Sequence, residues 1–243
     1  MASATLSGAA QAPASLHPFD RRVAEMAVHK DDINRMILDY LTSMAHTKAA
    51  LSFCREAKLD LQQSQEFVEC RASIMMLILE GIVMKAISLL NEWDPELLDV
   101  DEELHFDLLQ LHLIELIRMC QGKDPTPAVE FATNNLAPRA ANNPKFLKKL
   151  EQTMALIIFP HNSLQPELAA LLSPDLRRTV AYKVNMAMLR RRYPAHAEPS
   201  LLWLMRTRIH AEDVCRSKGR NLPEKIDLGM NPEGQDKPEP MDT

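Results

Sequence analysis

The sequence predicts an all-α protein, and the placement of glycine and proline carries that prediction. Between Arg21 and Arg216 there are only two glycines, Gly81 and Gly122, and each follows an apolar-periodic segment where a helix would end. A β-rich chain of this length would need more turn glycines, and the sequence has no Asn-Gly or Asp-Gly hairpin signal. Proline is absent from Phe19 to Asp94 and later recurs between apolar segments, where it starts helices rather than interrupting them.

Composition and charge exclude several classes of protein. The chain has 243 residues, 46% of them hydrophobic and 25% charged, which is typical of a globular protein that buries its core without disulfides. A net charge of −5 disfavours nucleic acid as a partner, since phosphate neutralisation needs a basic face. No segment has the ~18 uncharged apolar residues of a membrane span, and the first residues lack a signal peptide's positive charge. We expect a protein of the cytoplasm and nucleus that binds neither nucleic acid nor membrane.

The cysteines do not form a recognisable framework. The sequence has four, Cys54, Cys70, Cys120 and Cys215, and none belongs to a C-x-x-C pair. This spacing matches neither a zinc site nor a set of disulfides, so reduced and mostly buried thiols are expected.

The first predicted elements are a tail and two short helices. Residues 1–20 have no periodicity and are expected to be disordered. After them, apolar side chains recur at i, i+3, i+4, i+7, i+8 and i+11, on one face of a helix. They are Ile33, Met36, Ile37, Tyr40, Leu41 and Met44. A break near 45–46 precedes a second helix with Ala49, Ala50 and Phe53, and two such short helices cannot bury the stripe between themselves.

The remaining helices follow in order. A polar linker, 60–65, leads to a helix with its apolar side at Phe67, Cys70, Ile74, Leu77 and Ile78, then to a shorter helix over 83–90. Pro95 opens a turn, and the acidic residues 101–103 start the next helix, where the helix dipole favours them. Later segments begin at Pro127, Pro144, Pro174 and Pro199. From residue 217 the chain is rich in Lys, Gly, Pro and Glu and is expected to be disordered.

Three successive patterns resemble one protein family. The pattern Ile33-x-x-Met36-Ile37-x-x-Tyr40-Leu41, followed by Ala49 and Phe53, resembles the LisH motif, a two-helix dimerisation element, although Ala45-His46 stands where the family usually has glycine and an aromatic residue. The CTLH motif is matched by Arg71, Ile74, Gly81, Ala86-Ile87, Pro95-Glu96-Leu97-Leu98-Asp99, Leu104-x-Phe106 and Leu113-Ile114-Glu115-Leu116-Ile117-Arg118. The CRA region is matched by Ala128-x-x-Phe131-Ala132, Leu136, Leu156-Ile157-Ile158-Phe159 and Leu201-Leu202-Trp203. The chain is thus similar to LisH–CTLH–CRA proteins, with LisH expected at 29–61, CTLH at 66–123, CRA at 124–216 and a tail at 217–243.

This resemblance implies a scaffold without catalytic activity. Chains made of these three regions alone are similar to a scaffold subunit of GID/CTLH-type E3 ubiquitin ligases, which implies a link between RING-bearing subunits and the substrate-receptor module in proteasome-dependent degradation. The implied partners are other LisH–CTLH–CRA subunits, both RING-bearing and RanBPM-like, together with a substrate-receptor module or a second copy of this chain. No cofactor is implied.

The resemblance also indicates which residues bind partners. The expected LisH face consists of Ile33, Met36, Ile37, Tyr40, Leu41, Ala49 and Phe53. In the CTLH region, the residues expected to bind partners or to hold the structure are Arg71, Ile74, Ile78, Leu108, Leu111, Glu115 and Arg118. Because Glu115 lies among aliphatic residues, it is expected to be partly buried and paired with Arg118 or Arg71.

Two alternatives stay open. Glu102-x-x-His105 has the spacing of a di-iron ligand pair and His112-x-x-Glu115 is its reverse, but a di-metal site needs a second Glu-x-x-His motif that the sequence lacks. No spacing pairs a histidine with a cysteine that it could activate. We therefore expect no catalytic, cofactor-binding or metal-ligating residues. The alternatives are a helical adaptor unrelated to ubiquitin transfer and a helical metalloenzyme.

Overall fold

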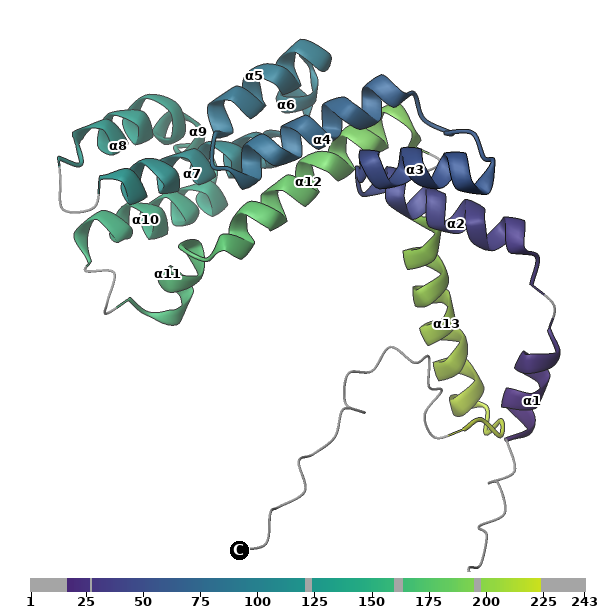
Figure 1. Ribbon diagram of the computed structural model, residues 1–243. Coiled ribbons are helices and arrows are strands. Elements are labelled where there is room, and N and C mark those ends of the chain that lie inside the picture. The colour runs from purple at the N-terminus through teal and green to yellow at the C-terminus, as the bar shows by residue number, and fades with distance from the viewer. Residues whose placement is uncertain (1–16, 27, 121–123, 160–163, 195–197, 224–243) are drawn as a thin grey trace, which may run out of the picture. The chain divides into compact units, whose positions relative to one another are not determined.

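The computed structural model describes residues 17–26, 28–120, 124–159, 164–194 and 198–223, and every regular element in these ranges is a helix (Figure 1). The prediction of an all-α protein is confirmed. None of the helices in the described ranges is long and apolar enough to cross a bilayer.

The chain divides into two compact units. The larger unit is 31–203, and the smaller one combines 1–30 with 204–243. The smaller unit contains α1, Pro18–Glu25, and most of α13, Ser200–Ser217. The larger unit contains, in order, α2 Lys30–Ser43, α3 Thr47–Ala57, α4 Gln65–Leu79, α5 Val83–Trp93, α6 Leu97–Val100, α7 Glu102–Met119, α8 Thr126–Phe131, the π-helix η1 Ala132–Leu136, α9 Ala137–Ala140, α10 Pro144–Ile158, α11 Pro166–Leu171 and α12 Pro174–Arg192.

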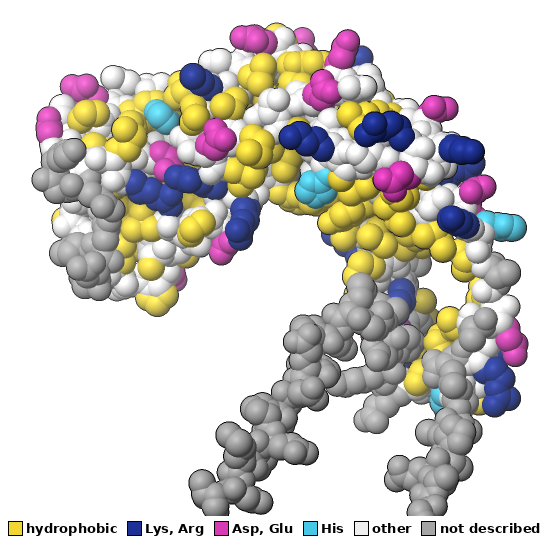
Figure 2. Space-filling view, viewed as in Figure 1, with side chains coloured by type: hydrophobic (Ala, Val, Ile, Leu, Met, Phe, Trp, Pro, Cys, Tyr) yellow, Lys and Arg dark blue, Asp and Glu magenta, His cyan; other side chains and the backbone are white. Residues whose placement is uncertain are grey.

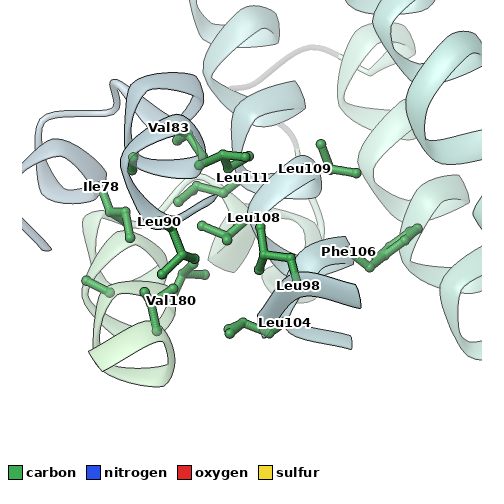
Figure 3. Close-up of a cluster of buried hydrophobic side chains, with 14 of the residues drawn as sticks. Ile78, Val83, Leu90, Leu98, Leu104, Phe106, Leu108, Leu109, Leu111 and Val180 are labelled. Atoms are coloured by element: carbon green, nitrogen blue, oxygen red, sulfur yellow. The ribbon is translucent and has the colours of Figure 1, made fainter. Parts of the chain in front are cut away.

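Helix α7 is the centre of the hydrophobic core. Its buried side chains point in every direction around the axis, as in a helix enclosed by its neighbours. In Figure 3, Leu104, Leu108 and Leu111 of α7 lie among side chains from α4, α5, α6 and α12, whereas Phe106 points away from them. On another side, the ring of Phe106 stacks on that of Phe146 in α10, with the ring centroids 4.3 Å apart. Helices α4 and α12 lie side by side along much of their length (Figure 1).

Helix ends follow the signals in the sequence. Gly81 has a φ of +82°, and the amide of Ile82 donates to the carbonyl of Leu77, which closes a Schellman motif at the end of α4. The expected role of Gly81 is confirmed, whereas Gly122 lies outside the described residues. At the start of α7, the carboxylate of Asp101 accepts a hydrogen bond from the amide of Leu104, as an N-cap does.

The structure differs from the sequence expectation in two places, and most of the expected tails are not described. Helix α1 begins within the segment expected to be disordered, because Pro18 favours the first turn and the His17 ring accepts from the amide of Phe19. Residues 1–16 and 224–243, which make up most of both expected tails, lie outside the described residues. The π-helix η1 precedes Pro138, whose missing N–H disturbs the ordinary hydrogen-bond register.

Candidate protein-interaction surface

The apolar stripe of α2 is left uncovered within the larger unit. We call Ile33, Met36, Ile37, Tyr40, Leu41, Ala49 and Phe53 the LisH face. Ile33 is 44% exposed and Ile37 39% exposed, Ala49 is exposed, and the other four side chains are half-buried. The buried residues of the pair are different ones, Leu38, Thr42, Ser43 and Ala50. Figure 2 shows hydrophobic side chains gathered over the region of α2 and α3. An exposed apolar face of this kind is a candidate contact site for another protein.

The corner between α2 and α3 is a second Schellman motif. Ala45 adopts a left-handed conformation with φ +57°, while the amide of Ala45 donates to Thr42 and that of His46 donates to the carbonyl of Leu41. A non-glycine residue in this conformation costs roughly 1–2 kcal/mol. The corner still forms because Ala45 is buried and both motif hydrogen bonds are made.

The guanidinium of Arg71 lies beneath this corner and is fully buried. Its Nη1 donates to the carbonyl of Ser43 (3.2 Å) and to Asn185 Oδ1 (2.6 Å). Its Nη2 donates to the carbonyl of Thr42 (2.8 Å) and to Gln63 Oε1 (2.5 Å). Burial lowers the pKa of Arg71 to about 10, so the side chain is still charged at neutral pH. We call Arg71 and its partners Thr42, Ser43, Gln63 and Asn185 the Arg71 network.

Glu115 is buried, and its partners are only partly those expected. Its carboxylate accepts from Arg118 Nη1 (3.1 Å) and, in a two-point contact, from Nε (2.8 Å) and Nη2 (2.5 Å) of Arg177. Arg118 was correctly expected, but Arg71 was the wrong candidate because it is engaged at the corner between α2 and α3. Arg177 was missed, since it lies 62 residues from Glu115 and nothing local in the sequence relates them.

The arginines on Glu115 also bind helix ends. Arg177 Nη1 donates to the carbonyl of Leu79, at the end of α4, and Arg118 Nη2 donates to the carbonyl of Leu172, just after α11. This charged cluster therefore joins four helices, α4, α7, α11 and α12. The other CTLH residues singled out, Ile74, Ile78, Leu108 and Leu111, are buried in the hydrophobic core.

A second buried carboxylate, Asp107, was not singled out from the sequence. Its two oxygens accept from Lys149 Nζ of α10 and Lys183 Nζ of α12, each at 2.6 Å. The cross-helix contact fixes α7 between α10 and α12. An acidic residue one turn after Leu104 and among leucines is the signal that could have marked it.

The thiols and histidines are surrounded by structural contacts. Burial raises the pKa of Cys70 to about 11, and burial also raises the pKa of Cys54, so neither favours the thiolate that a nucleophile needs. The His112 ring meets the ring of Phe131 edge-on, with centroids 4.7 Å apart. Among the residues that the structure describes, no group of three His, Cys, Asp or Glu side chains is arranged to hold a metal ion.

Exposed apolar side chains also occur far from the LisH face. Met119 at the end of α7, Val129 on α8 and Leu147 on α10 are 76%, 40% and 44% exposed. Within the larger unit, α8 and α10 lie at the end opposite to α2 and α3, as Figure 1 shows. Helix α12 runs between the two regions, and its 19 residues correspond to about 28 Å.

Comparison with known proteins finds two family models that match this chain. Residues 31–57 match the family model described as LisH, and residues 66–214 match the one described as the CTLH/CRA C-terminal to LisH motif domain. The chain is 39% identical over 178 residues to the GID complex subunit 8 of Schizosaccharomyces pombe, covering 71% of this chain and 74% of the relative. It is 33% identical over 189 residues to the glucose-induced degradation protein 8 homolog of Dictyostelium discoideum, covering 78% and 81%. It is 35% identical over 171 residues to the GID8 homolog of Arabidopsis thaliana, covering 70% and 69%.

Proposed function

Because the chain belongs to the LisH–CTLH family that includes the GID8 proteins, we propose that it is a scaffold subunit of a GID-type complex. In this role it binds other subunits and carries out no chemical step itself. The names of the relatives support membership in such a complex, since the Schizosaccharomyces pombe relative is named as a subunit of the GID complex. The function is positioning: each contact raises the effective concentration of one subunit near another.

One observation carries the proposal, namely the exposed LisH face. Isoleucines that are 44% and 39% exposed, on a helix whose buried residues lie on its other side, are typical of a surface that a partner covers. The proposed occupant is the LisH pair of a related subunit or of a second copy of this chain. Apolar side chains at the far end of the larger unit, on α7, α8 and α10, support a second contact region that does not overlap the first.

In finer detail, we propose that the complex is an E3 ubiquitin ligase. The chain then links RING-bearing and RanBPM-like subunits to a substrate-receptor module, and its loss impairs proteasome-dependent degradation. The sites of action proposed are the cytoplasm and the nucleus, which imaging of a tagged chain from its own locus would test.

Purification of the tagged chain from its own cells, followed by mass spectrometry, tests this proposal. We expect RING-bearing and RanBPM-like LisH–CTLH subunits to co-purify in fixed ratios. A helical adaptor unrelated to ubiquitin transfer would use the same kind of surface, but its co-purifying partners would lack a RING-bearing subunit. That result would contradict the ligase assignment.

A further inference from the structure

The α2–α3 pair lies outside the main hydrophobic core of the larger unit. The buried apolar residues of this region are Leu38, Ala45, Ala50 and Val68, and none of them belongs to the contiguous cluster formed by the other described core residues. Two of the four are alanines, which contribute little apolar area. Apolar burial therefore fixes the pair to the rest of the unit less firmly than it fixes the other helices.

Hydrogen bonds between polar groups connect the α2–α3 pair to the rest of the larger unit. Arg71 comes from α4, Asn185 from α12 and Gln63 from the linker before α4, and all three are buried. These three side chains converge on the last turn of α2. There the carbonyls of Thr42 and Ser43 no longer accept a hydrogen bond from the amide four residues further on. Asn185 Nδ2 donates to the carbonyl of Ser43 at 2.8 Å, so this carbonyl accepts from both α4 and α12.

The positive charge of Arg71 is stabilised at the C-terminal end of α2. A helix C-terminus carries the negative end of the macrodipole, and a buried cation there is stabilised by the carbonyls that it contacts. A guanidinium presents a rigid planar fork, and here the fork reaches four acceptors on three segments of the chain. A lysine ammonium at the same place could not satisfy four acceptors in these directions.

We infer that Arg71 is a positioning residue, which sets the direction in which the LisH face is presented by binding the last turn of α2 to α4 and α12. The residue touches no partner itself, since it is fully buried. Its removal frees the α2–α3 pair to turn relative to the core while the core stays folded. The consequence for binding rests on the proposed function, but the orientation of the pair does not.

A distance measurement on the full-length chain tests the orientation directly. Spin labels are placed by genetic encoding at Lys48 on α3 and Lys85 on α5, both exposed, and the distance between them is measured by pulsed electron resonance without any partner. The chain with Arg71 should give one narrow distance distribution. Arg71→Met should shift or broaden it, with faster amide exchange confined to α2 and α3.

A matched control separates this effect from general destabilisation. Arg177→Met removes a second arginine, which is partly buried and also binds a helix-end carbonyl, but this arginine is far from the corner between α2 and α3. It should leave the distance distribution unchanged. If Arg71→Met loses its helical circular dichroism, Asn185→Leu decides instead, because it keeps Arg71 and removes both contacts of Asn185.

This design distinguishes failure of the positioning role of Arg71 from failure of the LisH face as a binding site. An unchanged distance distribution in folded Arg71→Met or Asn185→Leu chain overturns the inference, whatever happens to binding. A changed distribution with undiminished capture of every subunit supports the positioning role of Arg71 and contradicts the LisH face as a binding site. We expect a changed distribution together with loss of one set of partners.

Discussion

Arg71 and Glu115 are buried charges of opposite sign in the same unit, and yet they do not pair with each other and have their partners in different places. Arg71 binds carbonyl and amide oxygens at one end of α4, and Glu115 binds two arginines near the other end. The sequence predicted the burial of Glu115 from its aliphatic neighbours. It could not predict Arg177 as the partner, because only the packing of α12 against α4 and α7 brings that side chain within reach.

Loss of the charge on Glu115 should destabilise the chain. Glu115→Gln leaves the guanidinium of Arg177 half-buried without a counter-charge, and we expect the free energy of unfolding to fall by about 2 kcal/mol. Urea denaturation followed by circular dichroism measures it. The control is Glu103→Gln on the same helix, whose exposed carboxylate lies 3.6 Å from Lys149 and should cost less than about 0.5 kcal/mol. Equal losses in both variants would contradict this account of the cluster.

Two half-buried histidines predict a pH dependence of stability. Burial lowers the pKa of His112 and, more than any other cause, that of His105. Because the unfolded chain then binds protons more readily than the folded one, stability is complete above the ordinary histidine pKa of ~6.5 and falls as pH drops through it. Urea unfolding at about pH 7.5 and about pH 5.5 should show this fall.

A pair of substitutions assigns the pH effect to a residue. His112→Gln should make the difference in unfolding free energy between the two pH values smaller, since one of the two titrating groups is gone. His105→Gln, at the second of these histidines, should also make the difference smaller. The same difference in the wild-type and His112→Gln proteins would show that His112 does not contribute.

At the scale of the element, helix ends were the most predictable feature. Prolines start α10, α11 and α12, and Gly81 ends α4 as its position suggested. The stripe on α2 was recognised from its period, but the sequence did not reveal that Leu38, Thr42 and Ser43 form the buried side instead. Thr42 can face inward because its hydroxyl donates to the carbonyl of Leu38, while Arg71 donates to the carbonyl of Thr42, a contact that spans 29 residues.

The same helix-end motif predicts substitutions of opposite sign. Lys58 ends α3 with φ +55° and is exposed, so Lys58→Gly should stabilise the chain by about 0.5–1 kcal/mol. Gly81→Ala should destabilise it by about 1–2 kcal/mol, because alanine disfavours φ +82° and its Cβ would lie 3.0 Å from Arg177 Nη2. Thermal unfolding of both variants checks this, and a change of the same sign in both would refute it.

At the scale of the whole molecule, the proposed function uses two of the regions in which apolar side chains are exposed. The LisH face and the region of α7, α8 and α10 lie at opposite ends of the larger unit, so two partners could be held without steric conflict (Figure 1). Six of the seven CTLH residues that the sequence singled out are buried, and Arg118 is half-buried, whereas the LisH residues are exposed or half-buried. The sequence could not separate these two groups, because periodicity marks an apolar face without saying what covers it.

The central claim is that the LisH face holds one set of subunits while other contacts hold another. The direct measurement is quantitative co-purification of the tagged Ile33→Asp/Ile37→Asp chain compared with the wild type. Both side chains are exposed, so the variant should keep its helical content. The matched control is Met76→Asp/Met84→Asp, which changes side chains that are 54% and 42% exposed on α4 and α5. We predict that the isoleucine variant loses one set of subunits and retains the rest, and that the control retains all; retention of every subunit by a folded isoleucine variant would contradict the claim.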